Sequence, residues 1–294
     1  MVSKMKKQRE ITVLFLVFGL AFFFPVALQA GDGDLLSRRS AVLGDTNRGQ
    51  SGDTARVAIT PTGLLQLEGY RYPVALWVPE NYSVKQAYPM VIVIPPQGAS
   101  PEKSIEYWKS MANRHSMFLL APTNLRPEDL PTKMDNWILG IKKDILERYR
   151  IDKDRVYLFG KDDGAHYAAY LGTKHPEAFA AVALVGGSWV GRFEGLMRPQ
   201  GRAAEQLPFL IFLKKSDKDL YEKTMAKAYQ FEQKGYPVQV NQVIGEDELA
   251  RVEFKKQLFE LMESKSQEWR SVVSENSKTF KERFRLAVKD FFTV

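Results

Sequence analysis

The residues with the clearest chemical potential stand between two glycines, Gly160 and Gly164. The segment 156–159 before them is apolar and predicts a buried strand, and a helical pattern begins directly after Gly164. A strand, a tight glycine-flanked turn and a helix form the layout G-x-S-x-G, which holds a nucleophile above a parallel sheet. The central residue here is Asp162 instead of serine. The chemistry of the chain therefore depends on whether a carboxylate can act at this place.

The elements that must position this turn alternate along the chain. Short apolar segments predict strands at 72–78, 89–94, 117–122, 156–159, 179–185, 208–213 and 238–243. Helical spacing predicts helices at 101–114, 134–149, 164–174 and 220–234. Strands that alternate with helices of 10 to 15 residues indicate βαβ units, hence a single α/β domain with a mainly parallel sheet sandwiched between helices.

The chain divides into four predicted parts. Residues 1–30 combine Lys4, Lys6, Lys7 and Arg9 with an apolar run of about 14 residues and a small residue before Gly31, which indicates a secretory signal peptide. A retained membrane anchor is the alternative, although the run is shorter than the roughly 20 residues that a span needs. Residues 31–54 predict a flexible leader, 55–264 the α/β domain, and 265–294 a C-terminal helical extension.

The composition restricts the compartment and the partners. The chain has 294 residues, a formal net charge of +7 and no cysteine, so an exported form has no disulfides. Removal of residues 1–30 would leave about +4, and no nucleic-acid motif is present, so we expect no nucleic-acid partner. We expect a periplasmic or secreted protein without a stable membrane span after cleavage. The C-terminal helices, expected on either side of a polar break at 274–277, could dock on the domain or lie on a membrane surface.

Several segments resemble the α/β-hydrolase esterases, in particular the polyhydroxyalkanoate-depolymerase and feruloyl-esterase-like group. The stretch 150–164 carries the likeness most clearly, 91–98 resembles the strand and oxyanion loop, 174–182 the segment after the elbow helix, and 208–217 the strand that delivers the acid. The resemblance covers about residues 65–260. It implies an α/β-hydrolase fold and ester hydrolysis by a serine, a histidine and an acid.

Transferred position by position, the side-chain roles of this group fall on acids. The nucleophile position is Asp162 and the acid position is Asp217, with Asp219 as an alternative. The position of the base lies in the loop 245–249, at Glu246 or Asp247. Three carboxylates could hold a divalent cation through oxygen ligands, but we predict no metal and no cofactor.

Asp162 has two interpretations. Aspartate tolerates unusual backbone angles, and two acids at the start of a helix, Asp162 and Asp163, are favoured by capping and by the helix dipole. Asp162 could therefore only hold the turn. Related dehalogenases and epoxide hydrolases use an aspartate here as the nucleophile, but they need a histidine to activate water.

No histidine stands where the resemblance requires one. The chain has three, His115, His166 and His175, and none lies in the loop 245–249. His166 follows Asp162 by four residues, at a place where related proteins often carry a histidine that only packs. The oxyanion hole could persist, because it needs only backbone N–H groups, here those of Gln97, Gly98 and Asp163.

The sequence therefore favours an exported α/β-hydrolase-fold protein of esterase ancestry, without serine-hydrolase activity, in a binding or structural role. The alternative is an active hydrolase that uses Asp162 on esters, or on halides or epoxides. Any ligand would be a small molecule or an ester derived from a polymer.

Overall fold

The structure, a computed structural model, describes residues 61–124, 131–198, 207–245, 248 and 251–291. The predicted signal peptide and leader lie outside the described residues, as do Glu246 and Asp247. All described residues belong to one compact unit, residues 58–294.

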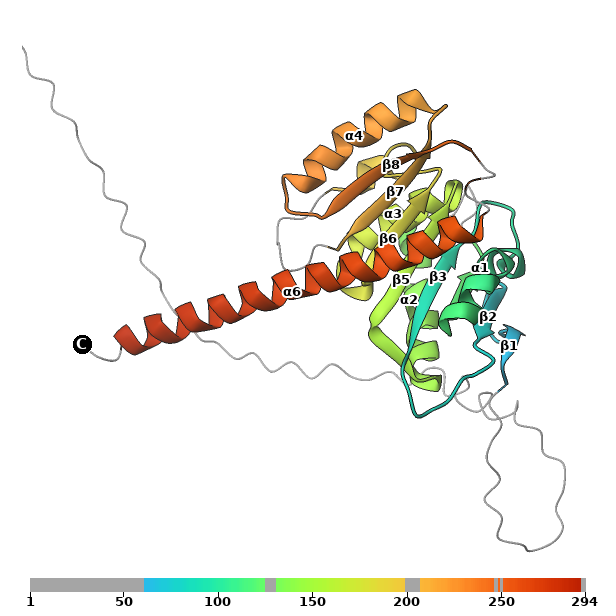
Figure 1. Ribbon diagram of the computed structural model, residues 1–294, viewed down its shortest axis with the longest axis horizontal. Coiled ribbons are helices and arrows are strands. Elements are labelled where there is room, and N and C mark those ends of the chain that lie inside the picture. Colours follow the sequence, from blue (N-terminus) through green and yellow to red (C-terminus); the bar gives the residue numbers. More distant parts are fainter. Residues whose placement is uncertain (1–60, 125–130, 199–206, 246–247, 249–250, 292–294) are drawn as a thin grey trace, which may run out of the picture. The chain divides into compact units, whose positions relative to one another are not determined.

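Eight strands form one sheet in the order β1-β2-β4-β3-β5-β6-β7-β8 (Figure 1). The strands are β1 Gly63–Gln66, β2 Val74–Val78, β3 Tyr88–Ile94, β4 Phe118–Pro122, β5 Ile151–Lys161, β6 Ala181–Val185, β7 Phe209–Lys214 and β8 Val238–Val243. The pairs β1–β2 and β2–β4 are antiparallel, and every pair from β4 to β8 is parallel. β2, β3, β4 and β6 are buried along their whole length, which explains why their sequences are continuous apolar runs.

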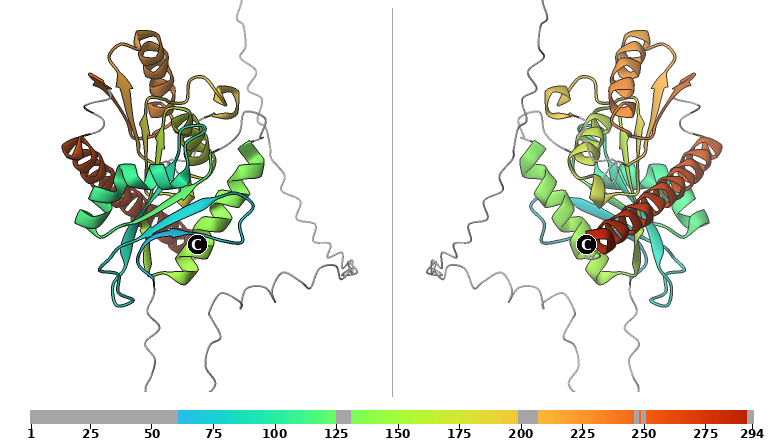
Figure 2. Two further views of the ribbon diagram at one scale, coloured as in Figure 1. Left: turned by 90° about the vertical axis from the view of Figure 1, so that its right-hand side faces the viewer. Right: turned by 90° about the vertical axis from the view of Figure 1, so that its left-hand side faces the viewer.

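Helices cover both faces of this sheet (Figure 2). The helices are α1 Pro101–His115, α2 Pro131–Arg148, α3 Asp163–Lys174, α4 Lys218–Glu232 and α6 Val252–Phe291, with short 3-10 turns η2 Pro176–Ala178 and η3 Glu194–Leu196. Apolar side chains of α2, α3 and α4 share one core with one face of the sheet. Those of α1 and α6 share a second core with the other face. The predicted mainly parallel sheet between two layers of helices is confirmed.

The C-terminal helix is longer than the sequence predicts. The polar residues at 274–277 were expected to separate two helices, but α6 runs through them without a break. Its residues Phe254, Leu258, Phe259 and Met262 are buried against α1 and the sheet. Over residues 254–262 the helix therefore docks on its own domain. In the described part of the chain, no helix combines the length and the apolar character needed to cross a bilayer.

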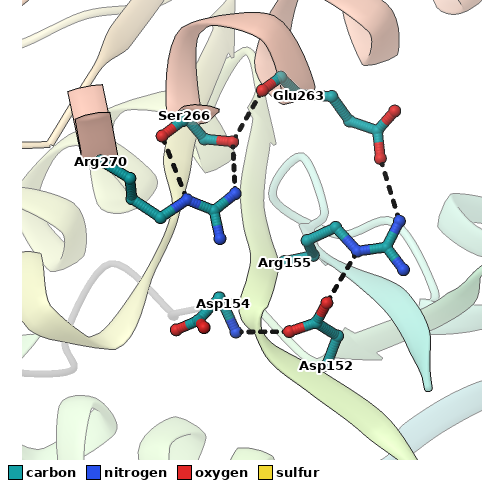
Figure 3. Close-up of polar contacts among 6 residues, drawn as sticks. All are labelled: Asp152, Asp154, Arg155, Glu263, Ser266 and Arg270. Carbon is teal, nitrogen blue, oxygen red and sulfur yellow. Dashed lines mark hydrogen bonds and ion pairs between the residues drawn. The ribbon is translucent and has the colours of Figure 1, made fainter. Parts of the chain in front are cut away.

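Polar contacts tie α6 to the strand that leads into the elbow (Figure 3). Arg155 of β5 donates from Nε to Asp152 Oδ2 at 2.9 Å and from Nη1 to Glu263 Oε1 of α6 at 3.4 Å. On the helix, Arg270 Nε donates to the carbonyl oxygen of Ser266 at 3.2 Å. Since about a third of the Arg155 side chain is exposed, this network orients the helix more than it stabilises the fold.

Candidate functional site

The turn after β5 has the backbone of a nucleophile elbow. Asp162 stands between β5 and α3 with φ 51° and ψ −122°, a conformation that residues other than glycine rarely adopt. Its N–H donates to the carbonyl oxygen of Val185 in β6 at 2.8 Å, and its own carbonyl accepts from the N–H of Ala165 at 2.9 Å. The turn is therefore fixed both to the neighbouring strand and to the first turn of α3.

The two glycines of the elbow are required by close contacts. A Cβ at Gly160 would lie 2.5 Å from the carbonyl oxygen of Gly164. A Cβ at Gly164 would lie 2.4 Å from the carbonyl oxygen of Ile94 and 2.5 Å from that of Pro95. No side-chain rotation can relieve such contacts with backbone atoms. The glycine spacing seen in the sequence thus reflects the packing of α3 against the end of β3.

The side chain of Asp162 does not cap the helix. Asp162 is the N-cap residue of α3, but its carboxylate accepts no capping hydrogen bond. Its Oδ1 instead lies beside Gly186, where an added Cβ would approach it to 2.5 Å. The tolerance of Asp162 for an unusual backbone is thus confirmed, whereas its expected role as a side-chain cap is wrong.

The predicted acid position is open to solvent. Asp217 is exposed at the N-cap of α4, directly after β7, and its carboxylate makes no capping hydrogen bond. The alternative, Asp219, is exposed and pairs with Lys223 Nζ at 2.8 Å. Both positions are those of solvated acids at a helix start. The described residues contain no group of three potential metal ligands from His, Cys, Asp and Glu. Glu246 lies outside them, so they do not test the alternative of a cation held by three carboxylates.

All three histidines are described, and each contacts a different part of the fold. His115, at the end of α1, packs on the ring of Phe259 in α6, with 5.0 Å between ring centroids. His175 places Nε2 3.4 Å from Asp135 Oδ2. This carboxylate is buried and also accepts from the hydroxyls of Tyr167 and Tyr170, so His175 belongs to a polar network that joins α2 to α3.

His166 is the histidine nearest in the chain to Asp162, and its ring is oriented. Its Nδ1 donates to the carbonyl oxygen of Ser188 at 2.9 Å. Because a carbonyl oxygen only accepts, this bond selects the tautomer with the proton on Nδ1 and leaves a lone pair on Nε2 in the neutral ring. Nε2 lies beside Gly187, where an added Cβ would be 3.3 Å from it and 2.8 Å from the carbonyl oxygen of Asp162.

The predicted oxyanion donors lie on adjoining pieces of backbone. Gln97 and Gly98 form an exposed turn after β3, in which Gly98 has φ 76°. Asp163 is the first residue of α3, so its N–H belongs to the positive end of the helix dipole. The contact of Gly164 with the carbonyls of Ile94 and Pro95 brings this helix end against the start of that turn. The backbone part of the hole is compatible with the fold.

A cavity of about 170 Å³ lies beside the elbow, at the carboxyl ends of β3 and β5 and under the first turns of α1. We call it the Tyr107 cavity; its lining includes Val93, Ala99, Lys103, Tyr107, Phe159 and Lys161. No pattern in the sequence pointed to this place. Lys161 could have been noticed, because it directly precedes the nucleophile position. The buried Lys255, which contacts Tyr107, carries no such signal, because it falls on an ordinary helical pattern.

The strand order, the two helical layers and the elbow define a protein of the α/β-hydrolase fold. Within it, residues 135–195 match the sequence pattern of the esterase PHB depolymerase family, so the chain is similar to the esterase and depolymerase group. The matched stretch runs from α2 through the elbow to η3. No curated protein matches the chain in sequence.

Solved structures of esterases share the fold at low sequence identity. A thermostable esterase has a TM-score of 0.50 at 19% identity over 67% of this chain, and the chain spans 62% of that esterase. An S-formylglutathione hydrolase (FrmB) from Staphylococcus aureus has a TM-score of 0.54 at 13% identity, over 71% of this chain and 99% of its own. A ferulic acid esterase has a TM-score of 0.51 at 14% identity, over 67% and 92%. These likenesses establish the fold.

Proposed function

We propose that this chain is an exported α/β-hydrolase-fold protein of esterase ancestry that has lost serine-hydrolase activity and acts by binding. The observation that carries the proposal is an elbow that keeps its backbone and its glycines while Asp162 occupies the nucleophile position. The contacts of His115 and His175 with other groups support it further.

Electrostatics also favours the loss of ester hydrolysis. A tetrahedral intermediate places a negative oxygen next to the nucleophile, where backbone N–H groups stabilise it by several kcal/mol. A carboxylate at 162 would oppose this charge at close range. Attack by the carboxylate on an ester would give an anhydride, which must itself be hydrolysed, and this second step needs a base.

The test is the hydrolysis of 4-nitrophenyl esters with acyl chains of two to eight carbons. We expect the purified protein to release 4-nitrophenol at the rate of buffer alone. Turnover by the wild type that disappears in Asp162→Ala would overturn the proposal.

A second candidate function follows from the orientation of His166. An aspartate nucleophile displaces a leaving group from an alkyl carbon, forms an alkyl ester, and needs a base to activate the water that cleaves it. The lone pair on His166 Nε2, beside Gly187, is available for this role. The protein would then act on haloalkanes or epoxides.

This candidate predicts a trapped intermediate. With 1-bromobutane, His166→Gln should release bromide once and gain the mass of one butyl group on Asp162. Asp162→Asn should do neither. A wild type that releases no bromide, together with a His166→Gln variant of unchanged mass, would exclude this mechanism.

Export is supported by the charge and hydropathy pattern of residues 1–30. We expect the protein from a bacterial host to be found outside the cytoplasm, with Gly31 as its first residue. Full-length protein retained in the membrane fraction would instead support the anchor. N-terminal sequencing of each fraction distinguishes the two.

A further inference from the structure

The walls of the Tyr107 cavity are apolar and aromatic. The rings of Tyr107 and Phe159 are stacked, with 5.9 Å between centroids and 17° between planes, and Val93 lies beside them on β3. A single ordered water needs only about 15 Å³, so a cavity of about 170 Å³ admits an organic molecule of several heavy atoms. An apolar chain or ring is the part of a ligand that these walls fit.

Lysine side chains stand at the wall of the cavity. Lys103 and Lys161 line it, and Lys161 Nζ lies 5.7 Å from the centroid of the Tyr107 ring. On the other element packed here, Lys255 of α6 places Nζ 4.1 Å from the same centroid and donates to the carbonyl oxygen of Tyr107 at 2.6 Å. The cavity also lies at the N-terminus of α1, where the helix dipole adds a partial positive charge.

Lys161 and Lys255 repel each other across the Tyr107 ring. Burial lowers the pKa of Lys255, and the charge of Lys161 lowers it further. The two acids of the first turns of α1 are held elsewhere: Glu102 accepts from Gln66 at 3.2 Å, and Glu106 pairs with Lys109 at 3.4 Å. An anion in the cavity would reduce the repulsion between Lys161 and Lys255 and would be attracted by the N-terminus of α1.

We propose that the Tyr107 cavity binds a small carboxylic acid as its anion, with the apolar chain between Tyr107, Phe159 and Val93 and the carboxylate towards Lys103 and Lys161. The inference deepens the proposed binding role, on which it rests. It names the class of ligand that the cavity beside the elbow would bind, and this binding requires no covalent step.

The first experiment uses the intact protein and four six-carbon probes. Isothermal titration calorimetry at pH 7 compares hexanoate with hexanamide, hexan-1-ol and hexylammonium. We expect hexanoate to bind at least about tenfold more tightly than the uncharged probes, the usual effect of one charge-assisted contact, and its affinity to fall with added salt. Equal affinity for hexanoate and hexan-1-ol, or no heat with hexanoate at millimolar concentration, would overturn the inference.

Single substitutions then locate the site. Lys161→Met and Lys103→Met keep an apolar stem and remove the charge, and we expect each to weaken hexanoate by about fivefold to tenfold without weakening hexan-1-ol. Ala99→Leu should reduce the binding of both probes by filling the space. Lys143→Met is the matched control, because Lys143 lies on α2 at the other face of the sheet and outside the cavity lining. This variant should bind as the wild type does. Unchanged hexanoate affinity in both lysine variants would show that hexanoate binds elsewhere and would overturn the inference. Thermal denaturation of each variant checks that it is folded.

The ester assay separates this inference from the proposed function. Hydrolysis of 4-nitrophenyl esters by the wild type would overturn the loss of catalysis and leave the ligand assignment to be decided by calorimetry. Absence of both hydrolysis and hexanoate binding would leave the loss of catalysis standing and remove the ligand class.

Discussion

Asp162 holds a backbone conformation that an L-residue keeps only under constraint. The constraint comes from hydrogen bonds of its main chain to Val185 and Ala165, and from Gly160 and Gly164 on either side. None of these depends on the side chain at position 162. The elbow can therefore persist as a structure after the chemistry that it once served has changed.

The strain at residue 162 gives a prediction about stability. Asp162→Gly and Asp162→Ala both remove the carboxylate, but only glycine adopts φ 51° without a steric penalty. We expect the glycine variant to have the larger free energy of unfolding, by about 1–2 kcal/mol, although glycine is normally the less stable choice. Urea denaturation measures both values, and an alanine variant of equal or greater stability would contradict the strain.

At the scale of elements, the elbow is held by the close contact of α3 with the end of β3. Gly164→Ala would push a methyl group into the carbonyls of Ile94 and Pro95. We expect a loss of at least about 2 kcal/mol in the free energy of unfolding, because the backbone itself must move.

Gly140→Ala is the matched control. Gly140 lies in the interior of α2 with no atom within 4 Å of an added Cβ, so the same substitution should raise the free energy of unfolding by about 0.5–1 kcal/mol. The two denaturation curves should shift in opposite directions. A shift of both in the same direction would show that the close contact at Gly164 is not what holds the elbow.

The packing of α6 on α1 predicts a dependence on pH. Burial lowers the pKa of His115, which outweighs the opposing charges of Glu263 and Glu260; Arg114 and Lys256 lower it further. Its Nε2 is buried without a hydrogen-bond partner among the described residues. As the pH falls below about 6.5, the unfolded chain takes up the proton before the folded chain does, so the stability that is present above pH 6.5 is lost towards the folded pKa.

His115→Gln removes this titration and serves as the comparison. We expect the wild type to lose more stability than the variant between pH 7.5 and pH 5.5, measured by denaturation at each pH. Identical losses in the two proteins would mean that His115 does not titrate differently on folding.

The alternation of strands and helices could be predicted because most strands are buried on both faces and therefore appear as continuous apolar runs. β1 was missed, since it is four residues long and alternates between half-buried and exposed positions at the sheet edge. β5 begins at Ile151, before the predicted start at Val156, because residues 152–154 continue the strand with side chains that are not buried.

The limits of prediction at the site and in α6 have physical causes. Serine, glutamate and asparagine at 274–277 suggest a break in the helix, but each lowers helix stability by only about 0.7 kcal/mol or less. The glycine pattern revealed the elbow, because close contacts of backbone leave no other residue type. The Tyr107 cavity could not be predicted, because its walls come from β3, α1 and β5, which only the folding of the chain brings together.

At the scale of the whole molecule, the α/β-hydrolase fold is kept while the nucleophile position holds Asp162 instead of serine. The sheet brings the elbow, the turn after β3 and the start of α1 together at its carboxyl edge, the usual place for ligands in such folds. At this edge the described residues offer a cavity with lysines at its wall, while the transferred acid position stands in solvent at Asp217. The cavity therefore offers a binding place beside the elbow that is separate from the transferred catalytic positions.

The most direct test of this account compares the wild type with the double variant Asp162→Ser, Glu246→His in the hydrolysis of 4-nitrophenyl butyrate. The variant places serine at 162 and histidine at 246, the positions where the resembling esterases carry their nucleophile and their base. We expect the wild type to stay at the rate of buffer and the double variant to exceed it. Turnover by the wild type at a rate that the double substitution does not increase would contradict the account.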